Sequence, residues 1–271
     1  MTANDAFRLY SQNKIPLADI KTVFDGVFSI PFDSLGIKGD VIIPDSLILS
    51  TLSKLRNGYP AVYLVGFDTI QGLRFFLSED TLIPRIETIE FIYDYLANNF
   101  NLNGKKVLDL CTGSGFIALS VKKLFPQAIV TGSDISIKAL AEARKSKEYN
   151  QLDVSLIQSD YFSKLAEKYD VIICNPPYIE ENSKDVCAPF EPSLALFSGI
   201  DGMDSYRTIF KDLYKHLNSK GMAFFELEAS NAIKTDSLFH SFYPKNFRTK
   251  LLKDLEGKNR YLQIEEINHQ E

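Results

Sequence analysis

Apolar positions recur in this chain with two different periods, and the change between them divides it into parts. Over residues 1–75, short amphipathic stretches are broken by prolines, and the leucines of 45–55 gather near one helical face. This pattern predicts a small domain of short helices. Residues 76–100 are predicted to be a linking hairpin and helix, because an extended stretch over 74–84 leads into a helical pattern over 86–100.

Short apolar runs alternate with helical patterns in residues 101–271. Strands that alternate with helices form a parallel sheet covered on both faces, so the fold class is predicted to be α/β. Residues 248–266 differ, because two extended runs around "LEGKN" predict an antiparallel hairpin beside a mostly parallel sheet. The predicted strands are 107–110, 128–134, 154–160, 170–174 and 221–228, and the predicted helices are 115–125, 137–149 and 205–217.

The composition is that of a globular protein without a basic surface. The 271 residues are 45% hydrophobic and 24% charged, with a formal net charge of −5. The first 80 residues hold seven Lys and Arg against nine Asp and Glu. Proteins that hold nucleic acid through its phosphates usually present a basic surface. We therefore expect no direct contact with nucleic acid.

The cysteines and histidines indicate a reducing compartment and no metal site. Three cysteines, odd in number and far apart, provide no disulfide framework. The three histidines are distant from one another and from any cysteine pair. No apolar run reaches the roughly 18 residues of a membrane span, and no secretory signal is evident. We expect a cytoplasmic protein without membrane contact. The residues are Cys111, Cys174, Cys187, His216, His240 and His269.

The stretch "VLDLCTGSGFIAL" combines a strand, a glycine loop and a helix. Gly113 and Gly115 let the backbone pass close under a ligand, and the helix start supplies free N–H groups. Asp134 ends the next strand, where its two oxygens can accept from a ribose diol. A plain tight turn beside a surface aspartate is the alternative. The predicted binding loop is Cys111, Thr112, Gly113, Ser114 and Gly115.

The loop chemistry favours S-adenosyl-L-methionine over other nucleoside cofactors. A third glycine for a dinucleotide and the lysine of a P-loop are both missing. Asp109 would repel a pyrophosphate but could attract an amino group. Asp160, after the third strand, can accept from the adenine amino group, and Tyr161 or Phe162 can cover the base. The alternative for these residues is a helix N-cap followed by a core aromatic.

The fourth strand leads into "NPPY", residues 175–178. Two prolines stiffen the turn and keep Asn175 out of the helical region. The Asn175 side-chain oxygen and the Pro176 carbonyl then provide two fixed acceptors, and Tyr178 adds an aromatic face. A planar –NH₂ group fits such a site, because its two hydrogens meet the two acceptors. A proline-rich loop that only ends a strand is the alternative.

The NPPY motif together with this loop resembles class I S-adenosylmethionine methyltransferases that act on planar amino nitrogens. The flanking segments are together similar to the release-factor glutamine N5-methyltransferases, and the resemblance covers residues 58 to about 265. It implies a small helical N-terminal domain that helps to hold the substrate and a Rossmann-like, seven-stranded methyltransferase domain over 101–271. The flanks are "GYPAVYLVG" (58–66), "TLIPRIETIEFI" (81–92), "FEPSLALFSGIDGMDSYRTI" (190–209) and "KDLEGKNR" (253–260).

The resemblance also implies a reaction and its residues. The substrate would be the glutamine of the Gly-Gly-Gln motif in class 1 peptide chain release factors. The cofactor residues would be Cys111 to Gly115, Asp134, Tyr161 and Asn175. The substrate amide would meet Asn175, Pro176, Pro177 and Tyr178, of which Asn175, Pro176 and Tyr178 would be catalytic.

This chain departs from the family pattern at three places. Cys111 stands where glycine is usual, and we expect it to have φ < 0. Ile86 and Ile89 replace the usual proline and glutamate of the segment before the loop. After Glu226, Leu227 stands in the middle position of the family's Glu-x-Gly and Glu228 replaces its glycine, which bears on the packing under the substrate loop.

Four further residues receive structural interpretations. Arg85 either contacts the cofactor carboxylate or the substrate, or pairs with an acid such as Glu87. Glu191 is expected to anchor the loop after NPPY. Cys111 and Cys174 are expected to pack near each other without forming a redox pair.

Two other functions fit parts of this pattern. Adenine also presents a planar –NH₂ and must be flipped into such a pocket, so a nucleic-acid adenine-N6 methyltransferase is one alternative. The acidic composition argues against it. A non-catalytic partner protein that keeps the fold is the other, but the glycine loop and Asn175 are both intact.

Overall fold

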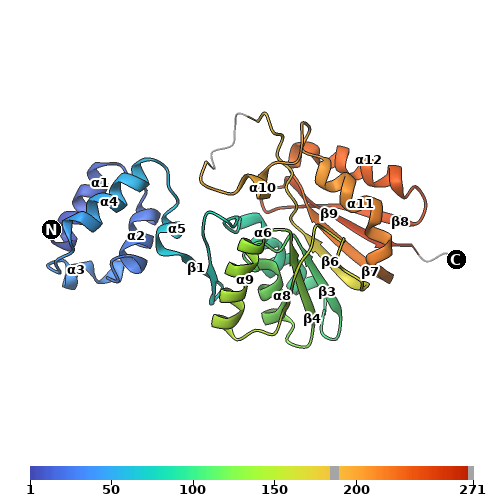
Figure 1. Ribbon diagram of the computed structural model, residues 1–271, viewed down its shortest axis with the longest axis horizontal. Coiled ribbons are helices and arrows are strands. Elements are labelled where there is room, and N and C mark those ends of the chain that lie inside the picture. Colours follow the sequence, from blue (N-terminus) through green and yellow to red (C-terminus); the bar gives the residue numbers. More distant parts are fainter. Residues whose placement is uncertain (184–188, 268–271) are drawn as a thin grey trace.

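The computed structural model describes residues 1–183 and 189–267. Figure 1 shows a small helical body at the N-terminus, in blue, joined through α5 and β1 to a larger body built on a sheet. Two residues discussed above, Cys187 and His269, lie outside the described ranges. Within those ranges, no helix is both long enough and apolar enough to cross a membrane.

The N-terminal helices share a hydrophobic core of their own. Tyr10, Phe24 and Ile48 are fully buried in it. The Tyr10 hydroxyl donates to the carbonyl oxygen of Ile48 at 3.0 Å, so the polar end of the ring is paired inside this core. Thr2 caps the first helix by accepting from the amide of Asp5. The helices are α1 (Ala3–Gln12), α2 (Leu17–Gly26), η1 (Phe32–Ser34), α3 (Leu35–Lys38), α4 (Asp45–Arg56) and α5 (Ala61–Val65).

A β-hairpin follows α5 and lies ahead of the linking hairpin predicted within 76–100; only its second strand overlaps the extended stretch predicted over 74–84. Gly66 ends α5 in the left-handed conformation, with φ +83°. The hairpin packs against the larger body, because the amide of Phe76 donates to Ser146 Oγ at 2.8 Å. The last helix of the N-terminal body thus ends at Val65. The elements are β1 (Phe67–Ile70), β2 (Leu73–Phe76) and α9 (Ile137–Asn150), which carries Ser146.

The larger body is built on a seven-stranded sheet of order β5-β4-β3-β6-β7-β9-β8. The pairs from β5 to β7 are parallel, whereas β9 runs antiparallel to both β7 and β8. The predicted α/β class, with a mostly parallel sheet and a C-terminal antiparallel hairpin, is confirmed. The strands are β3 (Lys106–Leu110), β4 (Ile129–Asp134), β5 (Ser155–Gln158), β6 (Tyr169–Cys174), β7 (Leu217–Glu226), β8 (Phe247–Lys253) and β9 (Asn259–Glu266).

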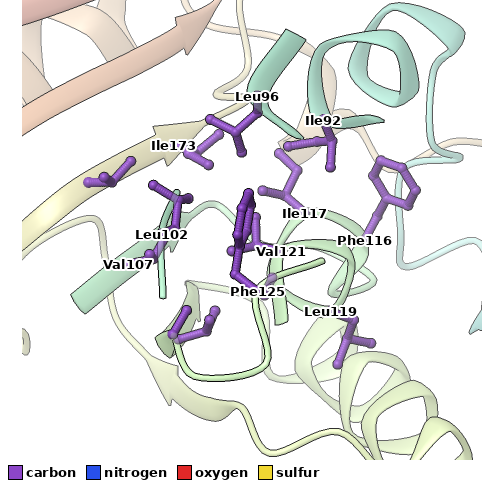
Figure 2. Close-up of a cluster of buried hydrophobic side chains, with 14 of the residues drawn as sticks. Ile92, Leu96, Leu102, Val107, Phe116, Ile117, Leu119, Val121, Phe125 and Ile173 are labelled. Atoms are coloured by element: carbon purple, nitrogen blue, oxygen red, sulfur yellow. The ribbon is translucent and has the colours of Figure 1, made fainter. Parts of the chain in front are cut away.

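Alternate residues of the central strands point into two separate cores. Val107 of β3 and Ile173 of β6 join the core on one face, and their neighbours Leu108 and Ile172 join the core on the other. Figure 2 shows Val107 and Ile173 in the first core, with Ile92 and other side chains around them. Both faces of the sheet are therefore covered by helices.

Helices α8 and η2 pack on the first face, and α11 and α12 on the second. The sequence pattern predicts no helix at α12. Its buried positions Ala232, Thr235 and Phe239 follow helical spacing, but Phe239 alone is large and apolar, so the signal is weak. The remaining helices are α6 (Ile86–Glu90), η2 (Phe91–Leu96, a π-helical turn), α7 (Ala97–Asn99), α8 (Phe116–Leu124), α10 (Ser193–Leu196), α11 (Asp204–His216), η3 (Ala229–Asn231) and α12 (Ala232–Phe242).

Truncating Ile173 tests the packing of this sheet. Ile173 is fully buried, whereas Ile129 on β4 is 57% exposed. We expect Ile173→Ala to lower the free energy of unfolding by about 2–5 kcal/mol, since it leaves a cavity between strand and helices. The matched control Ile129→Ala should change it by less than about 1 kcal/mol. Urea unfolding measures both, and equal losses would contradict the core assignment.

Candidate functional site

A cavity of about 430 Å³ lies at the carboxyl ends of β3, β4, β5 and β6. Its size falls within the roughly 300–1,000 Å³ typical of small-molecule sites. Three predicted site residues within the described ranges do not line the cavity: Gly115, Pro176 and Tyr178. The predicted residues that line it are Cys111, Thr112, Gly113, Ser114, Asp134, Asp160, Tyr161, Asn175 and Pro177.

The loop from β3 to α8 contains three left-handed residues. The φ angles are +66° at Cys111, +55° at Gly113 and +83° at Gly115. The expectation of φ < 0 at Cys111 is therefore wrong, and this conformation strains a non-glycine residue by about 1–2 kcal/mol. Hydrogen bonds hold the loop in this shape, since the Thr112 amide donates to the Ser133 carbonyl at 2.8 Å. The strain thus lies directly at the cavity wall.

Asp109 lies beneath the loop and does not line the cavity. Its side chain is buried, and Oδ2 accepts from Thr112 Oγ1 at 2.5 Å and from the Ala118 amide at 2.9 Å. Burial raises the pKa of Asp109 to about 7, although these two hydrogen bonds oppose the shift. Asp109, which was expected to attract an amino group, therefore lies behind the cavity wall and joins the loop to the first turn of α8.

Asp134 faces the cavity from the end of β4. Its Oδ2 accepts from the Gly113 amide and its Oδ1 from the Ser136 amide, both at 2.8 Å. A carboxylate has about four acceptor positions, so each oxygen can still accept from a ligand hydroxyl. Burial raises the pKa of Asp134, and the two amides oppose that rise. The side chain is thus held in one orientation with acceptor capacity left over.

The residues after β5 divide between the cavity and the core. Asp160 is exposed and lines the cavity together with Tyr161. The Tyr161 hydroxyl donates to Ser205 Oγ at 2.9 Å, which fixes the ring. Phe162 instead stacks on His216 with ring centroids 4.4 Å apart, on the second face of the sheet. Of the two aromatic candidates for covering a base, Tyr161 is the one at the cavity.

The NPPY loop continues β6 beside this wall. Asn175 and Pro177 line the cavity, and Pro176 is buried. The Tyr178 hydroxyl donates to Glu226 Oε1 at 3.3 Å. Burial raises the pKa of Tyr178 well above its ordinary value, and the Glu226 carboxylate adds to that rise. The tyrosine hydroxyl is therefore protonated and serves as a hydrogen-bond donor.

The two thiols expected to be neighbours lie at the base of the loop. Cys111 Sγ and Cys174 Sγ are 4.0 Å apart. Cys174 is fully buried, and burial raises the pKa of its thiol well above the ordinary value. A buried, protonated thiol behaves as a small apolar side chain.

An ion pair joins two segments that contribute to the cavity wall. Arg85 Nη2 lies 2.6 Å from Glu191 Oε1, and Glu191 Oε2 accepts from the Ile83 amide at 3.1 Å. Glu191 thus anchors its loop, and it is the acid that Arg85 pairs with. Glu87 instead faces Arg260 at 3.7 Å.

Two stretches of the wall were not predicted as binding residues. They are 79–82, ahead of α6, and 192–195, around α10. Neither carries a glycine pattern or a strand-end acid, so residue chemistry gave no signal for them. The segments of family resemblance, 81–92 and 190–209, include half of the first stretch and all of the second, without assigning either a contact.

Comparison with known proteins identifies the family. A family model described as "Methyltransferase small domain" matches residues 89–189. A release factor glutamine methyltransferase of Streptococcus pneumoniae is 37% identical over 211 residues, which are 76% of this chain and 75% of that protein. This chain belongs to the release factor glutamine methyltransferase family. As a methyltransferase of this family, it uses S-adenosylmethionine as its cofactor.

A second relative supports the family, and a solved structure supports the fold. A Flavobacterium psychrophilum release factor glutamine methyltransferase is 34% identical over 226 residues, covering 79% of this chain and 78% of that protein. The crystal structure of a methyltransferase from Pyrococcus furiosus shares the fold, with a TM-score of 0.54 at 19% identity. The match covers 73% of this chain and 90% of the Pyrococcus furiosus chain. The cavity fits the cofactor, because its wall joins a glycine loop to the carboxylates of Asp134 and Asp160.

The strain at Cys111 predicts a stabilising substitution. Cys111→Gly removes the Cβ that the left-handed conformation opposes, a relief of about 1–2 kcal/mol. The greater freedom of glycine in the unfolded chain offsets about 0.5–1 kcal/mol of this. Both Cys111→Gly and Cys111→Ala lose the thiol, but only alanine keeps the Cβ. We therefore expect the glycine variant to be the more stable of the two. Urea unfolding of the pair decides, and an alanine variant as stable as the glycine variant would refute the strain.

Replacing Asp109 predicts a change in pH dependence. Between about pH 4 and pH 7 the folded protein keeps a proton at Asp109 that the unfolded chain has released, since its pKa rises from 3.8 to about 7. Rising pH therefore removes stability from the wild type, by up to about 1.4 kcal/mol per pH unit. Asparagine does not titrate.

We expect the stability of Asp109→Asn relative to wild type to increase across this window and to level off above it. Urea unfolding at several pH values, without cofactor, measures the difference. A difference that is constant with pH would show that the carboxyl is already ionised at pH 4.

Proposed function

We propose that this protein transfers a methyl group from S-adenosylmethionine to the side-chain amide nitrogen of the glutamine in the Gly-Gly-Gln motif of class 1 peptide chain release factors. The observation that carries the proposal is the position of Asn175. It follows β6 directly and lines the cavity that also contains the glycine loop and Asp134. Membership of the release factor glutamine methyltransferase family supports the choice of substrate.

The cofactor contacts are assigned to the strand ends. Asp134 accepts from the ribose hydroxyls with the lone pairs that its two amide partners leave free. Asp160 accepts from the adenine amino group, and Tyr161 covers the base. The loop from Cys111 to Gly115 lies under the amino-acid part, where its backbone can approach closely.

The substrate amide is held by the NPPY loop. Bound S-adenosylmethionine supplies an electrophilic methyl on a sulfonium centre. Asn175 Oδ1 and the Pro176 carbonyl accept the two amide hydrogens, and the ring of Tyr178 lies against the amide plane. Held in this way, the nitrogen lone pair is aimed at the methyl, and the two acceptors favour the more pyramidal nitrogen of the transition state. As the nitrogen–carbon bond forms, the methyl–sulfur bond breaks with its electron pair staying on sulfur, and the nitrogen releases one proton to water.

The helices α1–α5 are assigned to holding the release factor next to this cavity. Two contacts tie them to the cavity region. The Tyr63 hydroxyl of α5 donates to the Thr81 carbonyl at 2.5 Å, and the Tyr59 ring packs edge-on against Phe190 at 5.0 Å. A release factor substrate also implies the cytoplasm as the place of reaction.

Methyl transfer from labelled S-adenosylmethionine tests the proposal. The acceptors are a recombinant class 1 release factor, the same factor with the motif glutamine replaced by alanine, duplex DNA and ribosomal RNA. We expect label on the first acceptor alone. Label on nucleic acid would establish the adenine reaction instead, and no label with cofactor binding retained would support a non-catalytic partner.

Asn175→Ala should lower kcat by at least about a hundredfold, because the amide loses a fixed acceptor, while cofactor affinity falls far less. Asn98→Ala is the matched control. Asn98 is exposed on α7, and its side chain donates to the Asp94 carbonyl in the preceding turn. Equal activity of the two variants would remove Asn175 from the reaction.

A further inference from the structure

A buried carboxylate collects hydroxyl donors from three separate parts of the larger body. Glu226, the last residue of β7, is 1% exposed. Its Oε2 accepts from Thr88 Oγ1 of α6 at 2.7 Å and from the Tyr261 hydroxyl of β9. Its Oε1 accepts from the Tyr178 hydroxyl of the NPPY loop at 3.3 Å. One side chain therefore connects three elements that are distant in sequence.

An ion pair does not account for this carboxylate. Arg260 is the nearby cation, but its closest acids are Asp254 at 3.3 Å, Glu87 at 3.7 Å and Glu228 at 4.0 Å. A buried ion is costly, and apolar residues of similar volume commonly pack as well or better. Hydroxyl donors compensate for the lost hydration and make the site directional, since each hydrogen bond has a preferred geometry. The carboxylate is thus suited to fixing the hydroxyl groups around it.

Tyr178 is the partner whose orientation matters for the cavity. Its backbone carbonyl packs against Gly202, where an added Cβ would come within 2.4 Å of it. Its hydroxyl is held by Glu226. The residue is therefore fixed at both ends, and the Glu226 contact is the one that sets where the far end of the ring lies.

Thr88 links the same carboxylate to the wall of the cavity. It lines the cavity, and its side chain is buried with the hydroxyl turned to Glu226. Glu226, at the end of β7, therefore holds both Thr88 of the cavity wall and Tyr178 of the NPPY loop. A displacement of the Glu226 carboxylate would therefore move both Thr88 and Tyr178.

We propose that Glu226 is a positioning residue, which fixes the Tyr178 ring for the substrate amide and ties it to the cavity wall through Thr88. This rests on the proposed function, in which Tyr178 lies against that amide. Glu226 acts through Tyr178 and touches neither cofactor nor substrate.

The variants that test this keep the fold and remove single interactions. Tyr178→Phe removes the hydroxyl and keeps the ring, and Glu226→Gln keeps the volume and removes the charge. Tyr243→Phe is the matched control, because its hydroxyl donates to the Phe210 carbonyl and it stands outside the cavity wall. Thermal unfolding and cofactor titration of each variant report on fold and cofactor site.

We expect Tyr178→Phe and Glu226→Gln each to lower kcat for the release factor by about tenfold or more, since misplacing a contact group slows the reaction strongly. KM and cofactor affinity should stay within about threefold, because the ring acts mainly in the transition state. The double variant should be no slower than the slower single variant, as required when one residue acts through the other. Tyr243→Phe should keep the wild-type kcat.

Two kinetic results would overturn the proposal: wild-type kcat in both variants, or effects that multiply in the double variant. A purely structural role would instead lower the unfolding temperature and cofactor affinity together with kcat.

A measurement without release factor separates this proposal from the proposed function. The flip rate of the Tyr178 ring is read by NMR with ring-labelled tyrosine, its signal assigned by loss in Tyr178→Phe. Glu226→Gln should speed the flipping. A ring-flip rate that is unchanged in Glu226→Gln would reject the positioning role, even if the wild type methylates the release factor. A wild type that transfers no label, with faster flipping in Glu226→Gln, would reject the proposed function and retain Glu226 as the residue that fixes Tyr178.

Discussion

The register of four parallel strands is the constraint on which the site depends. Leu110 of β3 is paired with Ser133 of β4 on one side and with Cys174 of β6 on the other. The next residues along these strands are Cys111, Asp134 and Asn175, so backbone hydrogen bonds bring the glycine loop, a carboxylate and the NPPY loop to one edge. Each of these segments leaves the sheet where its neighbours do, and the cavity is the space between them.

Buried polar groups then convert this shared edge into defined shapes. Asp109 ties Thr112 to the start of α8, Asp134 holds the Gly113 amide, and Glu226 gathers hydroxyls from three elements. Such groups are costly when unpaired and directional when paired, so they specify geometry where apolar packing specifies only volume. The raised pKa of Asp109 and the left-handed Cys111 indicate that this loop is held against local preference. The surrounding sheet and its two cores hold the loop in that state.

The helical body is connected to the same edge by few contacts. Tyr59 and Tyr63 of the α5 region reach Phe190 and the Thr81 carbonyl, beside the ion pair of Arg85 with Glu191. Thr81 and Arg85 line the cavity, so these contacts reach its wall. In the proposed function, this connection places a release factor held on α1–α5 next to the cavity.

Much of this architecture could be predicted from the sequence by itself. The alternation of strands and helices, the glycine loop, the acids at strand ends and the NPPY motif are local patterns. They determined the fold class and the part of the cavity wall that lies at the strand ends. Tertiary structure alone decided the rest. The left-handed φ of Cys111 depends on hydrogen bonds to β4, the Arg85 partner is an acid far away in sequence, and the hydroxyl partners of Glu226 come from three elements. Helix α12 presents only one large apolar side chain, Phe239, among its buried positions, so its periodicity is weak without the sheet that it covers. These features arise from contacts between segments that are distant in the sequence, and the local periodicity of the chain carries no information about such contacts.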